Sequence, residues 1–286
     1  MGDTLWLEPE KLSEVKDILS SGDPEIRVVS GGTALSLIMK QGMFDPNKIV
    51  SLKKLQSELR YITSDKAGNV RIGSMTTLRD LEVDALIKEK APVLSEALTH
   101  VANPRIRYVA SIGGNLSHGD AHLDMPPILM AMGAEVKIES AKGDRWLDLK
   151  EFFKGYYETA IEPDEILTEI MIPKQAEGIV GTYIKYTTLS NDDWPTVGVA
   201  AFLKKTDGIA GDSRIVISAA TDIPTQLFDV QHIIDGNQLD KTTIQKAAEK
   251  AFEVAEPLED LRGSVWYKKE MVKVHVRKAL EQLAKE

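Results

Sequence analysis

The chain has 286 residues, 43% of them apolar and 28% charged, a composition typical of a globular protein long enough for two domains. A formal net charge of −9 and the lack of any basic run argue against binding to nucleic acid or to an anionic membrane, because phosphate groups are bound by clustered Lys and Arg. The absence of Cys excludes disulfides, a Cys nucleophile, a cysteinyl flavin link and thiolate-bound iron–sulfur clusters within this chain.

The first residues show no basic segment followed by an apolar core, so they do not resemble a secretory signal. No apolar run approaches the length needed to cross a bilayer. We therefore expect a cytoplasmic protein with no integral membrane segment.

In the N-terminal half, short β-rich runs are separated by helical patterns and turn residues. We expect strands at 4–7, 26–29 and 48–52, helices at 9–20 and 33–41, a hairpin at 59–63 and 70–75, and helices at 78–90 and from Pro92 toward Val101. Thr77 is the expected N-cap of the helix at 78–90.

The first of two glycine pairs follows the strand expected at 26–29, in the segment Val28 to Leu35. Glycine adopts positive φ and allows close approach of a ligand, and the N–H groups of such a turn bind anions. The segment is either a tight turn whose helix is capped by Thr33, or a helix N-terminus that binds a phosphate.

The second pair follows Ala110, in Ser111-Ile112-Gly113-Gly114-Asn115, where we also expect a loop after a β-rich run. Two such loops suggest a long ligand that carries phosphate, such as a dinucleotide. The pattern His118-x-Asp120-x-His122-x-Asp124 comes next and suggests a metal site, but an irregular loop is favoured. Asp124 is better suited to accept hydrogen bonds from ribose or ribityl hydroxyls.

Towards the C-terminus we expect a short helix from Pro126 to Gly133, a hairpin at 135–139 and 145–149, a helical turn at 152–155 and a strand at 166–172. A linker at 175–180 precedes strands at 182–188, 197–203 and 214–219 and helices near 225–235, 241–256 and 266–285. Strands followed by helices indicate an α+β C-terminal domain.

Lys185 lies within an apolar strand, where it is either a solvent-facing residue or a cation beside a redox cofactor. The chain lacks Gly-x-Gly-x-x-Gly, a Walker-type Gly-Lys-Ser/Thr, His-Glu-x-x-His and Gly-x-Ser-x-Gly. A Rossmann dinucleotide site, a kinase and the common hydrolases therefore lack their usual sequence support.

Five motifs occur in an order that resembles the FAD-binding medium subunit of molybdenum hydroxylases of the carbon monoxide dehydrogenase and xanthine dehydrogenase type. They are Val28 to Leu35, Ser111 to Asn115, Asp124-Met125-Pro126-Pro127, Phe152-Phe153-Lys154-Gly155-Tyr156-Tyr157 and Asp164-Glu165-Ile166-Leu167.

The resemblance implies an α+β fold. Residues 1–175 would form an FAD-binding domain of the PCMH or vanillyl-alcohol-oxidase type, with subdomains at about 1–55 and 56–175. Residues 176–286 would form a smaller α+β domain of the CO dehydrogenase flavoprotein type, with a three-stranded sheet and helices.

The resemblance also implies that this chain binds FAD non-covalently and holds neither a catalytic residue nor a metal ligand. The backbone around the pyrophosphate would be that of Val28, Val29, Ser30, Gly31, Gly32, Thr33, Ala34, Leu35, Ser111, Ile112, Gly113, Gly114 and Asn115. Asp124 would bind the flavin or its ribityl chain, Leu167 would contribute backbone contacts, and Val101 would stand where the family often has a larger contact residue. Lys185 and the loop from Asn191 to Trp194 would lie near the isoalloxazine ring.

The partners implied are a small iron–sulfur subunit with two [2Fe-2S] clusters and a large molybdopterin subunit, in a dimer of heterotrimers. This chain would pass electrons from those clusters through FAD to an external acceptor. The alternatives are a stand-alone FAD-dependent oxidase and a flavin-free assembly or interaction protein.

Overall fold

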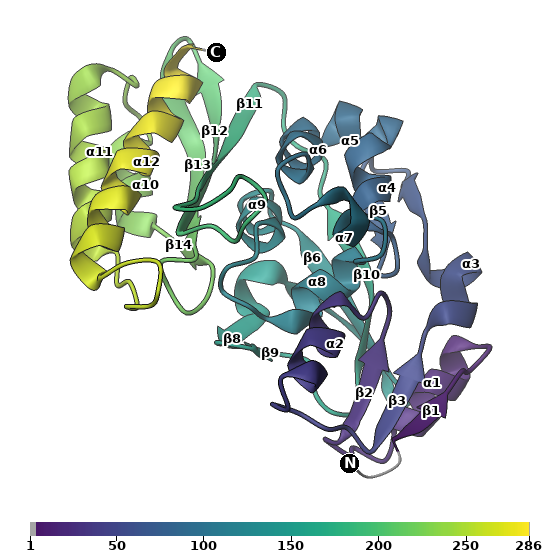
Figure 1. The fold of residues 1–286 in the computed structure, drawn as a ribbon. Helices are drawn as coiled ribbons and strands as arrows, with labels where there is room; N and C mark the ends of the chain where they lie inside the picture. Colours follow the sequence, from purple (N-terminus) through teal and green to yellow (C-terminus); the bar gives the residue numbers. More distant parts are fainter. Residues whose placement is uncertain (1–3, 286) are drawn as a thin grey trace.

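The computed structural model describes residues 4–285 (Figure 1). Its N-terminal unit is a parallel three-stranded sheet in the order β1-β3-β2. The strands are β1 Leu5–Leu7, β2 Ile26–Val29 and β3 Lys48–Ser51, and the helices are α1 Leu12–Leu19 and α2 Thr33–Lys40. Helix α1 buries Leu12, Val15 and Leu19, the helical spacing that predicts it, although it begins later than Pro9. Helix α2 buries no side chain, despite its apolar sequence.

The middle unit is a five-stranded antiparallel sheet in the order β4-β5-β10-β6-β7. Its strands are β4 Ile62–Ser64, β5 Val70–Gly73, β6 Glu135–Ser140, β7 Gly143–Asp148 and β10 Ile166–Ile172. Around it lie η1 Lys53–Leu55, α3 Gln56–Leu59, α4 Leu78–Val83, α5 Ala85–Lys90, α6 Pro92–Leu98, α7 Pro104–Arg107, α8 Ile112–His118, α9 Met125–Ala131, η2 Leu149–Glu151, and the hairpin of β8 Phe153–Gly155 with β9 Glu158–Thr159.

Two expectations for this unit are wrong. The single helix expected at 78–90 is divided at Asp84, whose ψ of 136° ends α4 and whose side chain accepts hydrogen bonds from the N–H groups of Leu86 and Ile87 at the start of α5. The helical turn expected at 152–155 is strand β8, because Phe153 pairs with Thr159. The expected N-cap Thr77 is confirmed, and it forms a capping box with Asp80.

The C-terminal unit is an antiparallel sheet in the order β11-β12-β13-β14, covered by three helices. The strands are β11 Ile179–Tyr186, β12 Val197–Thr206, β13 Ile209–Ser218 and β14 Thr225–Gln226, and the helices are α10 Phe228–Ile234, α11 Lys241–Val254 and α12 Val265–Lys285. Strand β11 thus begins within the expected linker. The short fourth strand β14 replaces the first residues of the helix expected at 225–235.

Both faces of the C-terminal sheet are buried, which explains the nearly continuous apolar run of β12. Val197 and Val199 belong to the core formed with α10, α11 and α12, whereas Ala200 and Phe202 belong to the core that includes α9. Figure 1 shows α11 and α12 on the outer side of this sheet and α9 on its inner side. The mixed helix and sheet fold is as expected. Within residues 4–285, no helix is long and apolar enough to cross a membrane.

A buried histidine on α12 makes stability depend on pH. His275 stacks on Tyr186 with ring centroids 4.7 Å apart, and burial, with a smaller effect of Lys278, lowers its pKa from 6.5 to about 4. The unfolded chain therefore binds a proton at this residue at a pH where the folded chain does not. The contribution of His275 to stability is complete above pH 6.5 and is lost as the pH falls toward 4.

We expect His275→Phe, which can keep the ring stack, to reduce the loss of unfolding free energy between about pH 7 and about pH 5 by about 2 kcal/mol. Urea unfolding of both proteins at the two pH values measures this difference. The exposed His232→Gln is the control and should leave the pH dependence unchanged. Identical pH dependence in His275→Phe and the wild type would contradict the prediction.

Candidate functional site

The structure brings the two glycine segments against each other. A Cβ atom at Gly31 would overlap the carbonyl oxygen of Val109, so only glycine fits there. Val109 directly precedes Ala110 and the second segment, which begins at Ser111. The loop after β2 and the start of α8 therefore form one surface.

The first segment has a row of free backbone donors. No N–H group of residues 30–35 donates a hydrogen bond to another atom of the described chain, residues 4–285. Gly32, with φ of 69°, is the N-cap of α2, and no side chain caps the helix, so the alternative in which Thr33 caps it is not observed. A turn followed by an uncapped helix N-terminus is a binding site for an anion such as a phosphate.

The second segment differs from the loop expected for it. Gly113 and Gly114 lie inside helix α8, which follows α7 rather than a strand, and neither has positive φ. The N–H groups of Ile112 and Gly113 donate to Thr76 and Ser74 at 2.9 Å each. Those of Gly114 and Asn115 donate to the side-chain and main-chain oxygens of Ser111, at 3.2 Å and 2.9 Å. The backbone N–H groups of residues 112–115 are therefore already used within the chain.

The second segment can contact a ligand in two ways, through the side chain of Asn115 and through the open space beside Gly114. The Oδ1 atom of Asn115 is buried without a hydrogen-bond partner in the described structure. A Cβ atom at Gly114 would meet only the Oγ atom of Ser111, at 3.0 Å, within the same segment. Both features suit a group that lies against α8 and hydrogen-bonds to Asn115.

Leu167 is linked to the second segment through the backbone, and Val101 belongs to the same hydrophobic core as Ile112 of that segment. Leu167 is on β10, and the next residue, Thr168, accepts a hydrogen bond at 3.0 Å from Ser74, whose carbonyl is the acceptor for Gly113. Val101 is 6% exposed, and its carbonyl accepts a hydrogen bond from Arg107 at 2.9 Å.

Asp124 and Lys185 form a buried ion pair between the middle and C-terminal units. The Nζ atom of Lys185 lies 3.1 Å from Oδ2 of Asp124 and donates to the carbonyl of His100 at 2.9 Å. The hydroxyl of Tyr183 donates to Oδ1 of Asp124 at 2.8 Å. Burial raises the pKa of Asp124, and the contacts with Lys185 and Tyr183 oppose that shift. Lys185 is thus not a solvent-facing strand residue.

Tyr183 is a residue that the sequence reasoning missed. Residues two apart on a strand share a face, so the position of Lys185 on β11 was a sufficient signal. Burial, with a smaller effect of the Asp124 charge, raises the pKa of Tyr183 well above its usual value, which keeps this hydroxyl a hydrogen-bond donor.

The histidine–aspartate pattern, which begins at the last residue of α8, does not form a metal centre within the described residues. Among residues 4–285, no group of three or more His, Cys, Asp or Glu side chains is arranged to hold a metal ion. His122 instead contacts two carboxylates, those of Asp120 and Asp260.

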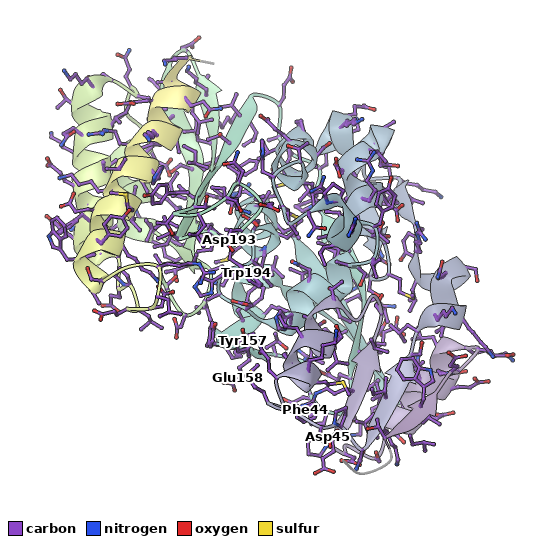
Figure 2. All side chains as sticks on the ribbon, viewed as in Figure 1. Phe44, Asp45, Tyr157, Glu158, Asp193 and Trp194 are labelled. Carbon is purple, nitrogen blue, oxygen red and sulfur yellow. The ribbon has the colours of Figure 1, made fainter. Side chains whose placement is uncertain are left out.

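The loop from Asn191 to Trp194 connects β11 with β12 and lies next to the C-terminal helices. The guanidinium of Arg262 is 3.8 Å from the carboxylate of Asp193 and 5.8 Å from the ring centre of Trp194. Figure 2 shows Asp193 and Trp194 between the two halves of the molecule, above Tyr157 and Glu158 of the hairpin β8–β9.

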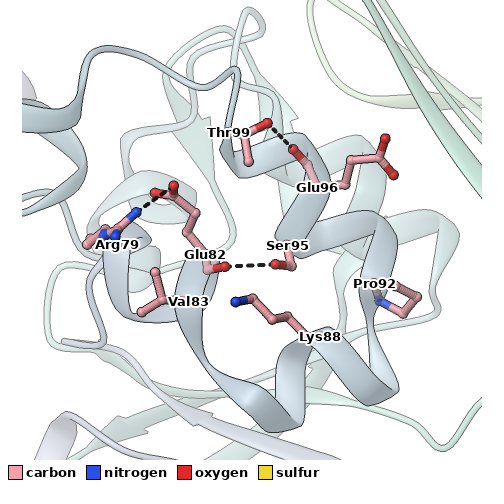
Figure 3. Close-up of a pocket in the computed structure, with 8 residues that line it drawn as sticks. All are labelled: Arg79, Glu82, Val83, Lys88, Pro92, Ser95, Glu96 and Thr99. Carbon is pink, nitrogen blue, oxygen red and sulfur yellow. Dashed lines mark hydrogen bonds and ion pairs between the residues drawn. The ribbon is translucent and has the colours of Figure 1, made fainter.

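Two hollows in the surface, each a pocket between secondary-structure elements, differ in whether predicted site residues line them. The larger, of about 480 Å³, lies among α4, α5 and α6, where Arg79 pairs with Glu82 and Ser95 donates to the carbonyl of Glu82 (Figure 3). It contains none of the predicted site residues. The smaller, of about 340 Å³, is lined by Lys185 and Tyr183 and lies between α6 and β11. The ion pair, rather than the larger hollow, therefore marks the candidate site.

Comparison with known proteins finds two family models that match this chain. The family model described as the FAD binding domain in molybdopterin dehydrogenase matches residues 2–175, and that of the CO dehydrogenase flavoprotein C-terminal domain matches residues 182–283. The chain is 30% identical to the carbon monoxide dehydrogenase medium chain of Afipia carboxidovorans, over 96% of this chain and 94% of that protein. It is 29% identical to the glyceraldehyde dehydrogenase medium chain of Sulfolobus acidocaldarius, over 98% of both.

Solved structures agree with these matches over nearly the whole chain. Reconstituted CO dehydrogenase from Oligotropha carboxidovorans has a chain that superposes with a TM-score of 0.94 at 29% identity, covering 99% of this chain and 98% of that one. Quinoline 2-oxidoreductase from Pseudomonas putida 86 gives a TM-score of 0.92 at 28% identity, covering 99% and 97%.

Proposed function

This chain belongs to the family of FAD-binding domains of molybdopterin dehydrogenases, and from this premise we propose that it is the FAD-binding electron-transfer subunit of a heterotrimeric molybdenum hydroxylase. Its relatives are dehydrogenase subunits, and the resemblance found in the sequence points to the same group. FAD, when bound, would accept electrons from [2Fe-2S] clusters of a partner subunit and deliver them to an external acceptor.

One observation carries the assignment of the FAD site: the segment with the free N–H groups of residues 30–35 packs on Val109, just before α8. Helix α8 adds the Asn115 side-chain oxygen, which has no partner among the described residues, and the open space at Gly114. We assign binding of the pyrophosphate to the N–H groups of the first segment. The second segment would pack closely against the cofactor and hydrogen-bond to it through the Asn115 side chain. The Asp124–Lys185 pair would present an ammonium and a carboxylate to the polar parts of the flavin. Val101 and Leu167 would complete the walls of the site.

We propose that residues 1–175 are the FAD-binding domain, with subdomains at about 1–55 and 56–175, and that residues 176–286 form the second domain. The absence of Cys agrees with iron–sulfur clusters and molybdopterin that are held by a small and a large partner subunit. A dimer of such heterotrimers in the cytoplasm is the assembly we infer.

Titration of the purified chain with FAD tests the proposal. We expect an oxidised-flavin spectrum from the bound cofactor, and a Kd at least about tenfold higher for Gly114→Val, since the new side chain would fill the space beside α8. Gly211→Val is the matched control, because a Cβ at Gly211 meets nothing within 4 Å and the site lies elsewhere.

The outcomes separate three functions. FAD binding with co-purifying molybdenum and iron supports the proposal. FAD binding together with substrate turnover by this chain alone would indicate a stand-alone oxidase. No FAD binding by a folded chain would overturn the proposal in favour of a flavin-free assembly or interaction protein.

A further inference from the structure

The loop between α8 and α9 contains a histidine held by carboxylates of two different units. The Nδ1 atom of His122 is 2.9 Å from Oδ1 of Asp120, in the same loop. Its Nε2 atom is 3.0 Å from Oδ2 of Asp260, which lies between α11 and α12. The histidine side chain is only 12% exposed, so water competes little for either contact.

The two contacts fix the protonation of His122. An ionised carboxylate only accepts hydrogen bonds, whereas a neutral imidazole has a single N–H donor. Both contacts are hydrogen bonds only when both ring nitrogens carry a proton, which makes His122 an imidazolium.

The surrounding charges balance such an imidazolium. The Nζ atom of Lys268, a residue only 1% exposed, lies 2.8 Å from the same Asp260 oxygen. Two carboxylates, one ammonium and one imidazolium give a cluster without net charge. Burial opposes ionisation of Asp120 and Asp260, yet the bonds from His122, Lys268 and the backbone hold the pKa of each below its usual value.

Two tyrosines and His118 also contact this cluster. The ring of Tyr156 meets the imidazole edge-on, with centroids 6.2 Å apart. The hydroxyl of Tyr157 donates to the other Asp120 oxygen at 3.2 Å, and His118 is 4.0 Å from that oxygen. Asp120 is therefore oriented from both sides, with one oxygen directed at His122.

The position of this cluster connects it with the candidate site. Asp124, the partner of Lys185, is two residues beyond His122 in the same loop. Arg262, which contacts Asp193 and Trp194, is two residues beyond Asp260. The backbone gives one more link between the units, since the N–H of Ala219 donates to the carbonyl of Ala121 at 2.9 Å.

We propose that His122 is a positioning residue: as an imidazolium between Asp120 and Asp260, it fixes the α8–α9 loop against the C-terminal unit and so aligns Asp124 with Lys185. Within the described residues this histidine–aspartate pattern is not arranged to hold a metal ion, and we assign it this positioning role instead. The consequence for flavin binding rests on the proposed function, whereas the link between the two units does not.

Nitrogen NMR of the chain labelled with ¹⁵N-histidine tests the protonation directly, without flavin. With five histidines in the chain, the signals of His122 are those missing from His122→Gln. We expect the nitrogen signals of the folded chain to be those of a ring that carries a proton on both nitrogens. A ring protonated on one nitrogen only would overturn the inference.

Two further measurements use His122→Gln, with the exposed His232→Gln as control. Deuterium exchange should become faster in 119–124 and 256–264, the loops that the cluster connects. The Kd for FAD should rise by about tenfold, as expected for a lost charge-assisted hydrogen bond. Unchanged exchange and unchanged Kd would overturn the inference. If the wild type does not bind FAD, the proposed function fails, while the NMR and exchange results still decide the role of His122.

Discussion

Replacing Gly31 by Ala is expected to lower the unfolding free energy by about 3 kcal/mol, because the new methyl group overlaps backbone rather than a movable side chain. The obstructing carbonyl belongs to Val109, which cannot easily withdraw. Its own N–H donates to Ile106 at 3.0 Å, and the carbonyl of its neighbour Ala110 accepts from Leu78 at 2.9 Å. The substitution therefore forces the loop after β2 away from α8, and we expect FAD binding to be lost as well.

Urea unfolding of the flavin-free chain measures this effect, with Gly211→Ala as the matched control. Gly211 lies on β13 with nothing within 4 Å of an added Cβ and without positive φ, so its replacement should change stability by no more than about 0.5 kcal/mol. Equal stability of the two variants would show that the loop and α8 do not meet as described.

The glycine pairs show both the value and the limit of sequence reasoning. Their pattern correctly drew attention to two segments that meet in space, but of the four glycines only Gly32 has the expected positive φ. At Gly31 and Gly113 the requirement is close contact with Val109 and Ser74, which are distant in sequence. Such contacts depend on the tertiary fold, and no local pattern reveals them.

Most strands and helices were predictable because their burial follows the apolar pattern of the sequence. The apolar residues have helical spacing in α1 and form a nearly continuous run in β12. The exceptions have tertiary or side-chain causes. Asp84 interrupts a continuous helical pattern by capping a new helix, and Phe153 is drawn into a strand by pairing with Thr159. The cluster around His122 was equally out of reach, since Asp260 is 138 residues away along the chain.

The second large effect is expected for Asp124→Asn, which should lower the unfolding free energy of the flavin-free chain by about 3 kcal/mol. The side chain of Lys185 is only 9% exposed, and after the substitution its ammonium would keep the His100 carbonyl but lose its counter-charge. A buried charge left without its partner is costly, whereas the amide still accepts a hydrogen bond from Tyr183. Urea unfolding measures the change.

The double variant Asp124→Asn with Lys185→Met separates the cost of the unpaired charge from the value of the pair. Because burial raises the pKa of Asp124, the intact pair contributes little net stability, and its removal as a whole should return the unfolding free energy to within about 1 kcal/mol of the wild type. A double-mutant cycle then gives a coupling energy of about 2 kcal/mol or more. FAD binding should stay impaired in the stable double variant, since the ammonium is absent. Full FAD affinity there would mean that the pair serves only to join the two units and has no part in the flavin site.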